Sequence, residues 1–510
     1  MRGSERDRTN AEALATEQLL DGLGARSTGG VLITFIAQLL TLFIQIGYIA
    51  ATARLLRPGD FGVAAMAVSV TGLAGLFTDM GLSTASVQRK TLDQNIVSAL
   101  FAANVLLGLL AMFVCFGLAY PATLFFNDHR VAYAVLAYGA IIPVSAAAVQ
   151  HVALLQRGMR QFALQVVGIS SIVLGSLVGV LVAILGGSYW ALIAAAAATA
   201  VTRLVLSWSM SPWRPSKVSD WSEVRGVVHF GAHMTGFNVT HFVATQTDNA
   251  LIGAFWGADA AGVYSRAYQL MLLPLNAVSG PLGSVFLPAL SRLQSDPARW
   301  RHTFLRVFLV SSTIGCAIAA VLIVSGDKLV YIVYGPSWSR SVPLFRWLSV
   351  SMLTTFPMGA MAWAFVSLGN VKAMFQWGLI SVVVLVAVFA GTVSFGVQAL
   401  AIGYSCSLLL LTPLIYYLAL RRSSLSPWTA LSQILRLWTA SLCGIACGLL
   451  TARQELGLIP GLIAEALATM SVFGLALAAL TYRQKCWRDL PRETWALVQA
   501  ALKRPRIARG

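Results

Sequence analysis

Residues 96–120 read IVSALFAANVLLGLLAMFVCFGLAY, a stretch without a single charged side chain. A helix that crosses the hydrocarbon core of a bilayer needs about 20 mainly apolar residues, and this stretch is longer than that. Similar apolar runs follow one another from about residue 30 to about residue 481, separated by breakers such as Gly186-Gly187. The stretch is therefore typical of a membrane-spanning helix, and it predicts many more like it.

The composition agrees with a chain that lies in lipid. Of the 510 residues, 57% are hydrophobic and only 11% are charged, whereas a soluble globular chain carries roughly 25% charged residues. About 14 spanning helices of about 20 residues would account for that hydrophobic fraction. Long apolar runs also exclude a transmembrane β-barrel, whose strands alternate in polarity. We therefore expect an all-α polytopic membrane protein with short loops.

The excess of basic residues predicts the orientation of the helices. The net charge is +17, and Lys and Arg concentrate in the cytoplasmic loops of membrane proteins. With the N-terminus in the cytoplasm, about 28 of the 36 Lys and Arg residues fall on the cytoplasmic side. This predicts an even number of helices with both termini cytoplasmic, and it removes the need for a nucleic-acid partner. The runs 374–395 and 397–420 can merge, so 12 and 14 helices both stay open.

A weak internal repeat predicts the domain organisation. Residues 49–63 read IAATARLLRPGDFGV, residues 252–263 read IGAFWGADAAGV, and Gly62-Val63 recurs as Gly262-Val263. Each copy links the first two helices of a six-helix block, which favours two parallel repeats; chance similarity between helices rich in Ala and Gly is the alternative. The expected parts are an N-terminal cytoplasmic tail (1–28) without the apolar core of a signal peptide, a first six-helix lobe (29–210), a cytoplasmic linker (211–228), a second six-helix lobe (229–420), two additional helices (421–482) and a basic cytoplasmic tail (483–510).

Ionisable residues inside the apolar runs are candidate functional residues, because a charge at bilayer depth costs several kcal/mol. Asp79 lies deep in the second run; a cap at the inner helix end is its alternative role. His233, His241 and Asp248 share one helical face about 120° wide, which favours a cavity lining. Neutral His titrates near physiological pH, so these groups are candidates for proton handling. Hydrogen bonding to neighbouring helices is the alternative.

Three arginines on the predicted outer side need an explanation, because basic residues are few there. They are Arg54, Arg57 and Arg266, and arginine binds phosphate oxygens through paired hydrogen bonds. The sequence contains no GxxxxGK phosphate loop, no HExxH motif and no nucleophile elbow. The six cysteines show neither zinc spacing nor a disulfide framework. We therefore expect a transporter, not an enzyme, with no cofactor and no metal site.

Three segments carry a resemblance to a known family. Residues 54–90, RLLRPGDFGVAAMAVSVTGLAGLFTDMGLSTASVQRK, resemble the start of polysaccharide-exporting flippases of the Wzx type. Residues 247–294, TDNALIGAFWGADAAGVYSRAYQLMLLPLNAVSGPLGSVFLPALSRLQ, are similar to that family's second repeat, and residues 153–162, ALLQRGMRQF, fit the loop after its fourth helix. The chain is identified as a member of the polysaccharide transport family of the multidrug/oligosaccharidyl-lipid/polysaccharide exporter superfamily. Colanic-acid and exopolysaccharide exporters are the nearest subgroup.

The resemblance implies a fold, an activity and a set of residues. It implies two six-helix lobes around a central cavity, and alternating access driven by an ion gradient or the membrane potential. The substrate would be an undecaprenyl-pyrophosphate-linked oligosaccharide, flipped across the bacterial inner membrane for exopolysaccharide or lipopolysaccharide synthesis. The partners implied are membrane lipid and the polymerase and chain-length or export proteins of the same pathway. The positions that match the family pattern are Arg54, Asp60, Asp79, Gln88, Arg89, Asp248, Asn249, Arg266 and Pro274.

Two other functions compete with a flippase. A cation-coupled exporter of small drugs belongs to the same superfamily, but the long signatures favour the polysaccharide branch. A membrane-bound glycan polymerase or ligase would need a sizeable periplasmic domain. The longest predicted outer loop, residues 326–342, is too short for one.

Overall fold

The structure is a computed structural model, and it describes residues 23–79, 82–83, 86, 92–218, 222–454 and 456–488. Over those ranges all regular secondary structure is helical. The chain forms two compact units. Unit 1 holds the described residues up to Gly262, and unit 2 holds those from Val263 onward. The all-α fold predicted from the sequence is confirmed.

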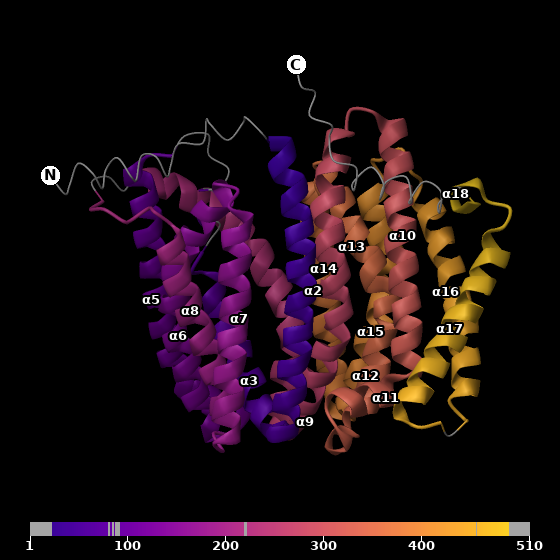
Figure 1. Cartoon of the computed structure of the whole chain (residues 1–510), viewed down its shortest axis with the longest axis horizontal. Coiled ribbons are helices and arrows are strands. Elements are labelled where there is room, and N and C mark those ends of the chain that lie inside the picture. The colour runs from indigo at the N-terminus through magenta and orange to yellow at the C-terminus, as the bar shows by residue number, and fades with distance from the viewer. Residues whose placement is uncertain are drawn as a thin grey trace. The chain divides into compact units, whose positions relative to one another are not determined.

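Unit 1 is a bundle of long helices joined by short turns (Figure 1). Its helices are α2 (Leu23–Leu55), α3 (Pro58–Leu76), α5 (Gln94–Phe126), α6 (His129–Arg157), α7 (Gln161–Ile184), α8 (Trp190–Met210) and the first leg of α9 (Ser222–Arg292). Helices α5 and α6 form one hairpin and α7 and α8 form another, while α2 packs along α7. We call the end at which α2, α5 and α7 finish the outer end, following the predicted topology.

The sequence around Pro58 explains why α3 begins there. Arg57 has an extended backbone (φ −86°, ψ 155°), and Pro58 takes the first helical position, which suits its fixed φ and its missing N–H. The backbone N–H of Arg57 donates a hydrogen bond of 2.9 Å to the Asp60 carboxylate. Asp60 thereby closes a tight outer turn between α2 and α3.

Small residues let the helices of unit 1 approach one another closely. Gly108 of α5 lies against Pro143 and Ala146 of α6, and Gly175 of α7 lies against Thr199 of α8. Lipid gives helices no hydrophobic reason to associate, so close van der Waals packing at small residues has to hold them together. This packing is what a bundle surrounded by lipid requires.

Helix α9 is broken at one glycine. It runs over 71 residues, and Gly257 is its non-helical position (φ 77°, ψ −178°). Glycine adopts this backbone conformation far more readily than any residue with a side chain. Gly257 therefore divides α9 into two legs, and it lies between the apolar runs 229–256 and 262–289 of the sequence. The second leg belongs to unit 2 from Val263 onward.

Unit 2 is also a helical bundle, and it ends in an additional hairpin (Figure 1). After the second leg of α9 come α10 (Pro297–Val324), α11 (Gly326–Val333), η2 (Pro336–Trp338), α12 (Ser341–Val350), α13 (Met352–Ser367), α14 (Val371–Thr392), η3 (Val393–Phe395), α15 (Val397–Leu420), α16 (Pro427–Thr451), α17 (Leu458–Thr481) and the short α18 (Lys485–Arg488). The hairpin α16–α17 packs against α10, and α17 also contacts α11.

The structure bears on the number of membrane spans, for which the sequence left both 12 and 14 open. Among the described residues, 11 helices are long and apolar enough to cross a membrane, and α12 with α13, bent by 43°, raises the number to 12. The two legs of α9 are not among them. Large apolar side chains such as Phe43 and Leu410 are exposed on helix surfaces, as lipid-facing residues are. The protein is thus a multi-pass membrane protein with 11 to 12 evident spans.

Candidate functional site

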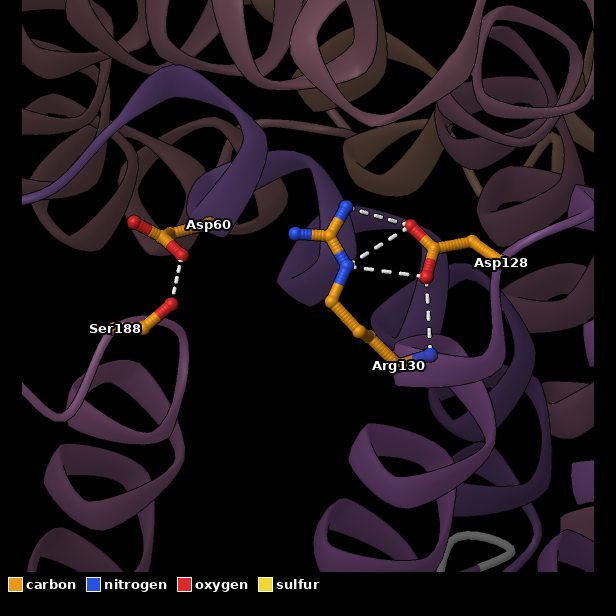
Figure 2. A network of polar contacts seen from close by, with 4 residues as sticks. All are labelled: Asp60, Asp128, Arg130 and Ser188. Atoms are coloured by element: carbon orange, nitrogen blue, oxygen red, sulfur yellow. Dashed lines mark hydrogen bonds and ion pairs between the residues drawn. The ribbon is translucent and has the colours of Figure 1, made fainter.

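The outer end of unit 1 carries a network of polar contacts (Figure 2). The Ser188 hydroxyl, in the turn between α7 and α8, donates a hydrogen bond to the Asp60 carboxylate. The Arg130 guanidinium faces Asp128 and donates to it through Nε and Nη2, at 3.1 and 2.7 Å. Asp128 also accepts from the Arg130 backbone N–H at 2.9 Å, which caps α6. These contacts fix the three outer turns of the unit.

The Asp128 carboxyl is perturbed by two opposing effects. Its partial burial, the largest single effect, would raise the pKa, because burial penalises the charged form. The hydrogen bonds from the side chain and backbone of Arg130, together with its charge, outweigh the burial and lower the pKa. Asp128 is therefore a stable carboxylate, paired with Arg130 at the membrane surface.

The structure separates two of the predicted site residues along the bundle. Arg54 is exposed in the last turn of α2, at the outer end. Asp79 follows α3 at the opposite end, about 30 Å away by the rise of a helix. Arg54 and Asp79 therefore do not share a site, and Arg89 lies outside the described residues.

Asp79 is hydrogen-bonded by the residues that follow it. Its carboxylate accepts from the backbone N–H of Ser83 at 2.8 Å and from the Ser83 hydroxyl at 2.5 Å. A carboxylate at the start of a helical turn stabilises N–H groups that lack a partner in the chain. The contacts of Asp79 are those of the capping role that the sequence left open beside a transport role.

Asp248 and Asn249 are buried in the first leg of α9. Their exposed fractions are 1% and 6%. The Asp248 carboxylate accepts from the Asn249 backbone N–H at 2.7 Å and from its side-chain amide at 3.3 Å. The break at Gly257 lies nine positions after Asp248, about 14 Å along the helix.

The first leg of α9 packs on α3. Phe242 lies against Gly72, and Gly253 lies against Met66. Asp248 lies between these two contacts, at the level of the middle of α3. The side-chain oxygen of Asn249 is buried and has no hydrogen bond within the described part of the chain. Asp248 and Asn249 thus form a polar pair buried inside unit 1. The side chains of His233 and His241, on the same stripe, lie outside the described residues.

Arg266 lies in unit 2, on the second leg of α9. Its side chain is partly buried, and its backbone carbonyl accepts a hydrogen bond of 2.8 Å from the Tyr334 hydroxyl. Two residues further on, the Tyr268 hydroxyl lies 3.4 Å from that of Tyr404. Arg266 is also about 14 Å along its leg from Gly257. A guanidinium group is suited to bind phosphate oxygens.

Sequence reasoning missed a buried ion pair. In unit 2 the Lys328 ammonium, on α11, donates to the Glu465 carboxylate, on α17. The exposed fractions of their side chains are 11% and 1%. A lone carboxylate inside the apolar run 458–481 was the available signal, since such charges are rare at bilayer depth.

A second buried polar group was also missed. Asn104, Gln150 and His151 are fully buried on the facing helices α5 and α6. Both amide atoms of Asn104, the Gln150 oxygen and both His151 nitrogens lack hydrogen bonds within the described residues. The His151 ring packs against Trp208 and Trp213, with centroids 4.5 and 5.2 Å away. Buried polar atoms of this kind are usually satisfied by ordered water.

The described residues contain no group of three or more His, Cys, Asp or Glu side chains that would hold a metal ion. The candidate binding groups described above are carboxylate, amide and guanidinium groups on the helices.

Comparison with known proteins identifies the family. The profile described as "Polysaccharide biosynthesis protein" matches residues 51–343, which is more than half of the chain. The chain belongs to this family. The resemblance drawn from residues 54–90 and 247–294 is thereby confirmed, since both segments lie within the matched region.

Individual relatives and solved structures agree with this assignment. The succinoglycan biosynthesis transport protein ExoT of Rhizobium meliloti (strain 1021) is 24% identical over 344 residues, covering 68% of this chain and 69% of the relative. The lipopolysaccharide biosynthesis protein WzxC of Escherichia coli (strain K12) is 22% identical over 317 residues, covering 61% and 64%. The inward closed conformation of the lipid II flippase MurJ superposes with a TM-score of 0.71 at 12% identity, covering 89% of this chain and 98% of that one. At this identity the structural likeness shows a shared fold.

Proposed function

We propose that this protein flips an oligosaccharide repeat unit, linked to undecaprenyl pyrophosphate, across the bacterial inner membrane. The product would enter exopolysaccharide or lipopolysaccharide synthesis. The family match over residues 51–343 carries the proposal. Relatives named for succinoglycan transport and lipopolysaccharide biosynthesis support it, as does a fold shared with a lipid II flippase. The activity is transport, not catalysis.

The proposed topology has 14 spans. The two legs of α9 add two crossings to the 12 that the other helices allow. The spans form two six-helix lobes (29–210 and 229–420) around a central cavity, followed by two additional helices (421–482). Both termini and the linker 211–228 are cytoplasmic, in accord with the distribution of Lys and Arg.

The chemistry of translocation requires substitutes for water. A sugar–pyrophosphate headgroup loses several kcal/mol for each unpaired polar group in hydrocarbon. Asp248 and Asn249 offer hydrogen bonds to sugar hydroxyls near mid-depth, and Arg266 offers a guanidinium to the pyrophosphate. Asp79, Arg54 and Arg89 act at the two ends of the path, and His233 and His241 act in ion coupling. The lipid tail stays in the bilayer while the lobes alternate between inward and outward access.

Deletion of the gene tests the proposal. Loss of the protein should stop polymer export and cause lipid-linked repeat units to accumulate in the cytoplasmic leaflet. Continued export without such accumulation would refute the flippase function. Efflux of small cationic drugs, lost in the same deletion while polymer is exported normally, would support the cation-coupled drug exporter instead.

Two substitutions test the proposed residues. Asp248→Asn and Arg266→Ala should each lower export about tenfold or more, the effect of losing one charge-assisted hydrogen bond in transport. The amount of protein in the membrane should stay unchanged. Arg299→Ala is the matched control, because Arg299 is 78% exposed on α10 and pairs with Asp296 at the surface. Wild-type export by both variants would remove these residues from the site.

A further inference from the structure

Two glycines at the outer end of unit 1 make a reciprocal contact. A Cβ atom on Gly62 would lie 1.7 Å from the backbone oxygen of Ala258, and a Cβ atom on Gly262 would lie 1.8 Å from that of Pro58. The two partner pairs correspond to each other in the internal repeat, where Gly62-Val63 recurs as Gly262-Val263. We call residues 58–62 and 258–262 the outer seam.

The outer seam has local two-fold symmetry. Residue 62 touches residue 258 in the same way that residue 262 touches residue 58. The remaining contact joins two equivalent positions, because a Cβ atom on Gly59 would lie 2.6 Å from the carboxylate of Asp259. A contact in which equivalent positions meet is the mark of a self-complementary interface. The contacts thus join corresponding positions of the two copies of the sequence repeat.

The seam requires glycine at two positions. A Cβ atom cannot lie within 2 Å of a carbonyl oxygen, and backbone oxygens cannot turn aside as a flexible side chain can. Gly59 is different, since its neighbour is the end of the exposed Asp259 side chain. Gly75 of the same helix α3 has no atom within 4 Å of its Cβ position. Helix α3 thus supplies two control positions, Gly59 and Gly75, at which an added methyl group meets fewer atoms than at Gly62.

We propose that the outer seam is the seal that closes the outer end of the translocation path, with Gly62 and Gly262 as the residues that allow it to close. The inference rests on the proposed flippase function. The seam follows directly on the break at Gly257, and Gly253 continues the close packing against Met66 and Phe126. A headgroup leaves on the outer side when the seam parts, and the seam closes again before the next one enters.

Alanine substitutions test the requirement for glycine. Gly62→Ala and Gly262→Ala should each lower the flipping rate at least tenfold in proteoliposomes that contain a lipid-linked oligosaccharide. Gly59→Ala should lower it less, and Gly75→Ala should leave it at the wild-type rate. Equal rates for Gly62→Ala and Gly75→Ala would overturn the inference.

A disulfide tests the seam without relying on a substitution in its centre. The pair Gly59→Cys and Asp259→Cys places two thiols at the seam, where the Gly59 Cβ position lies 3.6 Å from the Asp259 carboxyl carbon, the atom whose place the sulfur of a cysteine at 259 would take. Mass spectrometry of the linked peptides detects the disulfide. Oxidation should stop flipping and a reductant should restore it, whereas each single cysteine variant should be insensitive to oxidation.

The outcomes separate the seal from the function. If the wild type and the fully cross-linked variant both flip the lipid-linked oligosaccharide, the proposed seal is refuted and the proposed flippase function stands. Failure of the cross-link to form would also overturn it, because the contact would then be absent. A wild-type protein that flips no lipid-linked oligosaccharide would refute the proposed function, whatever the cross-link shows.

Discussion

The buried pair of Lys328 and Glu465 gives the sharpest prediction for stability. Glu465→Gln leaves an ammonium group with 11% of its side chain exposed and no carboxylate to balance it. Removing one partner of a buried ion pair costs about 3–5 kcal/mol. The Lys328 side chain is also closely packed, since its Cε lies 2.5 Å from the position that a Cβ atom on Gly461 would take. We therefore expect Glu465→Gln to lower the equilibrium constant for folding more than a hundredfold.

The assay is thermal or denaturant unfolding of the purified protein in detergent, run as a double-mutant cycle. Lys328→Met should be as destabilising as Glu465→Gln, because it leaves a buried carboxylate. The double variant should recover most of the loss, since an apolar and a neutral group need no ion partner. Asp327→Asn is the control: its pair with Arg346, at 3.0 Å, is about one-third exposed and should be worth about 1 kcal/mol or less.

Two results would refute this reasoning. A single variant that unfolds like the Asp327→Asn control would mean that the pair of Lys328 and Glu465 is solvated. A double variant that loses the sum of both single effects would mean that the two side chains act independently.

Two further predictions concern the other contacts. The pKa of Asp128 is lowered in the folded protein, so the ionised carboxylate stabilises the fold at pH values above its ordinary pKa near 3.8. This stabilisation is lost as the pH falls through the lowered pKa of the folded protein. Arg130→Gln should weaken this loss of thermal stability in acid, and an unchanged pH profile of the melting temperature would contradict the prediction. Gly448→Leu should destabilise unit 2 by about 1–3 kcal/mol or more, because the Cβ position of Gly448 lies 2.1 Å from the Thr469 hydroxyl; Gly474→Leu, with open space around it, should unfold at the wild-type temperature.

The sequence predicted the helical fold because apolar runs and loop charges report directly on the bilayer. The break at Gly257 was expected between two runs, although its backbone conformation was not. The sharp bend at Ser351, between α12 and α13, was not expected, since residues 343–368 read as one continuous apolar run. A bend in a helix depends on which neighbours it packs against, and periodicity carries no information about that.

The sequence indicates which charged residues lie in apolar runs, but it does not indicate which partners they contact. Asp248 was singled out as a charge in an apolar run, and it is buried as such a residue should be. Glu465 carries the same signal, but it lies outside the segments 54–90, 153–162 and 247–294 that resemble the family. The hydrogen bond between Ser188 and Asp60 joins two turns far apart in the chain, and no local pattern marks it. Such contacts follow from the packing of the bundle.

The reciprocal glycine contact also has a consequence for biogenesis. Residues 58–62 leave the ribosome about 200 residues before their partners at 258–262, which at 5–20 residues per second is a delay of about 10–40 s. During that interval the turn between α2 and α3 exists without the segment that covers Gly62. The hairpins α5–α6 and α7–α8 must therefore remain stable in the bilayer through their own contacts. The seam can be completed only after α9 has entered the membrane. Order of synthesis thus makes the seam one of the later contacts of unit 1 to form.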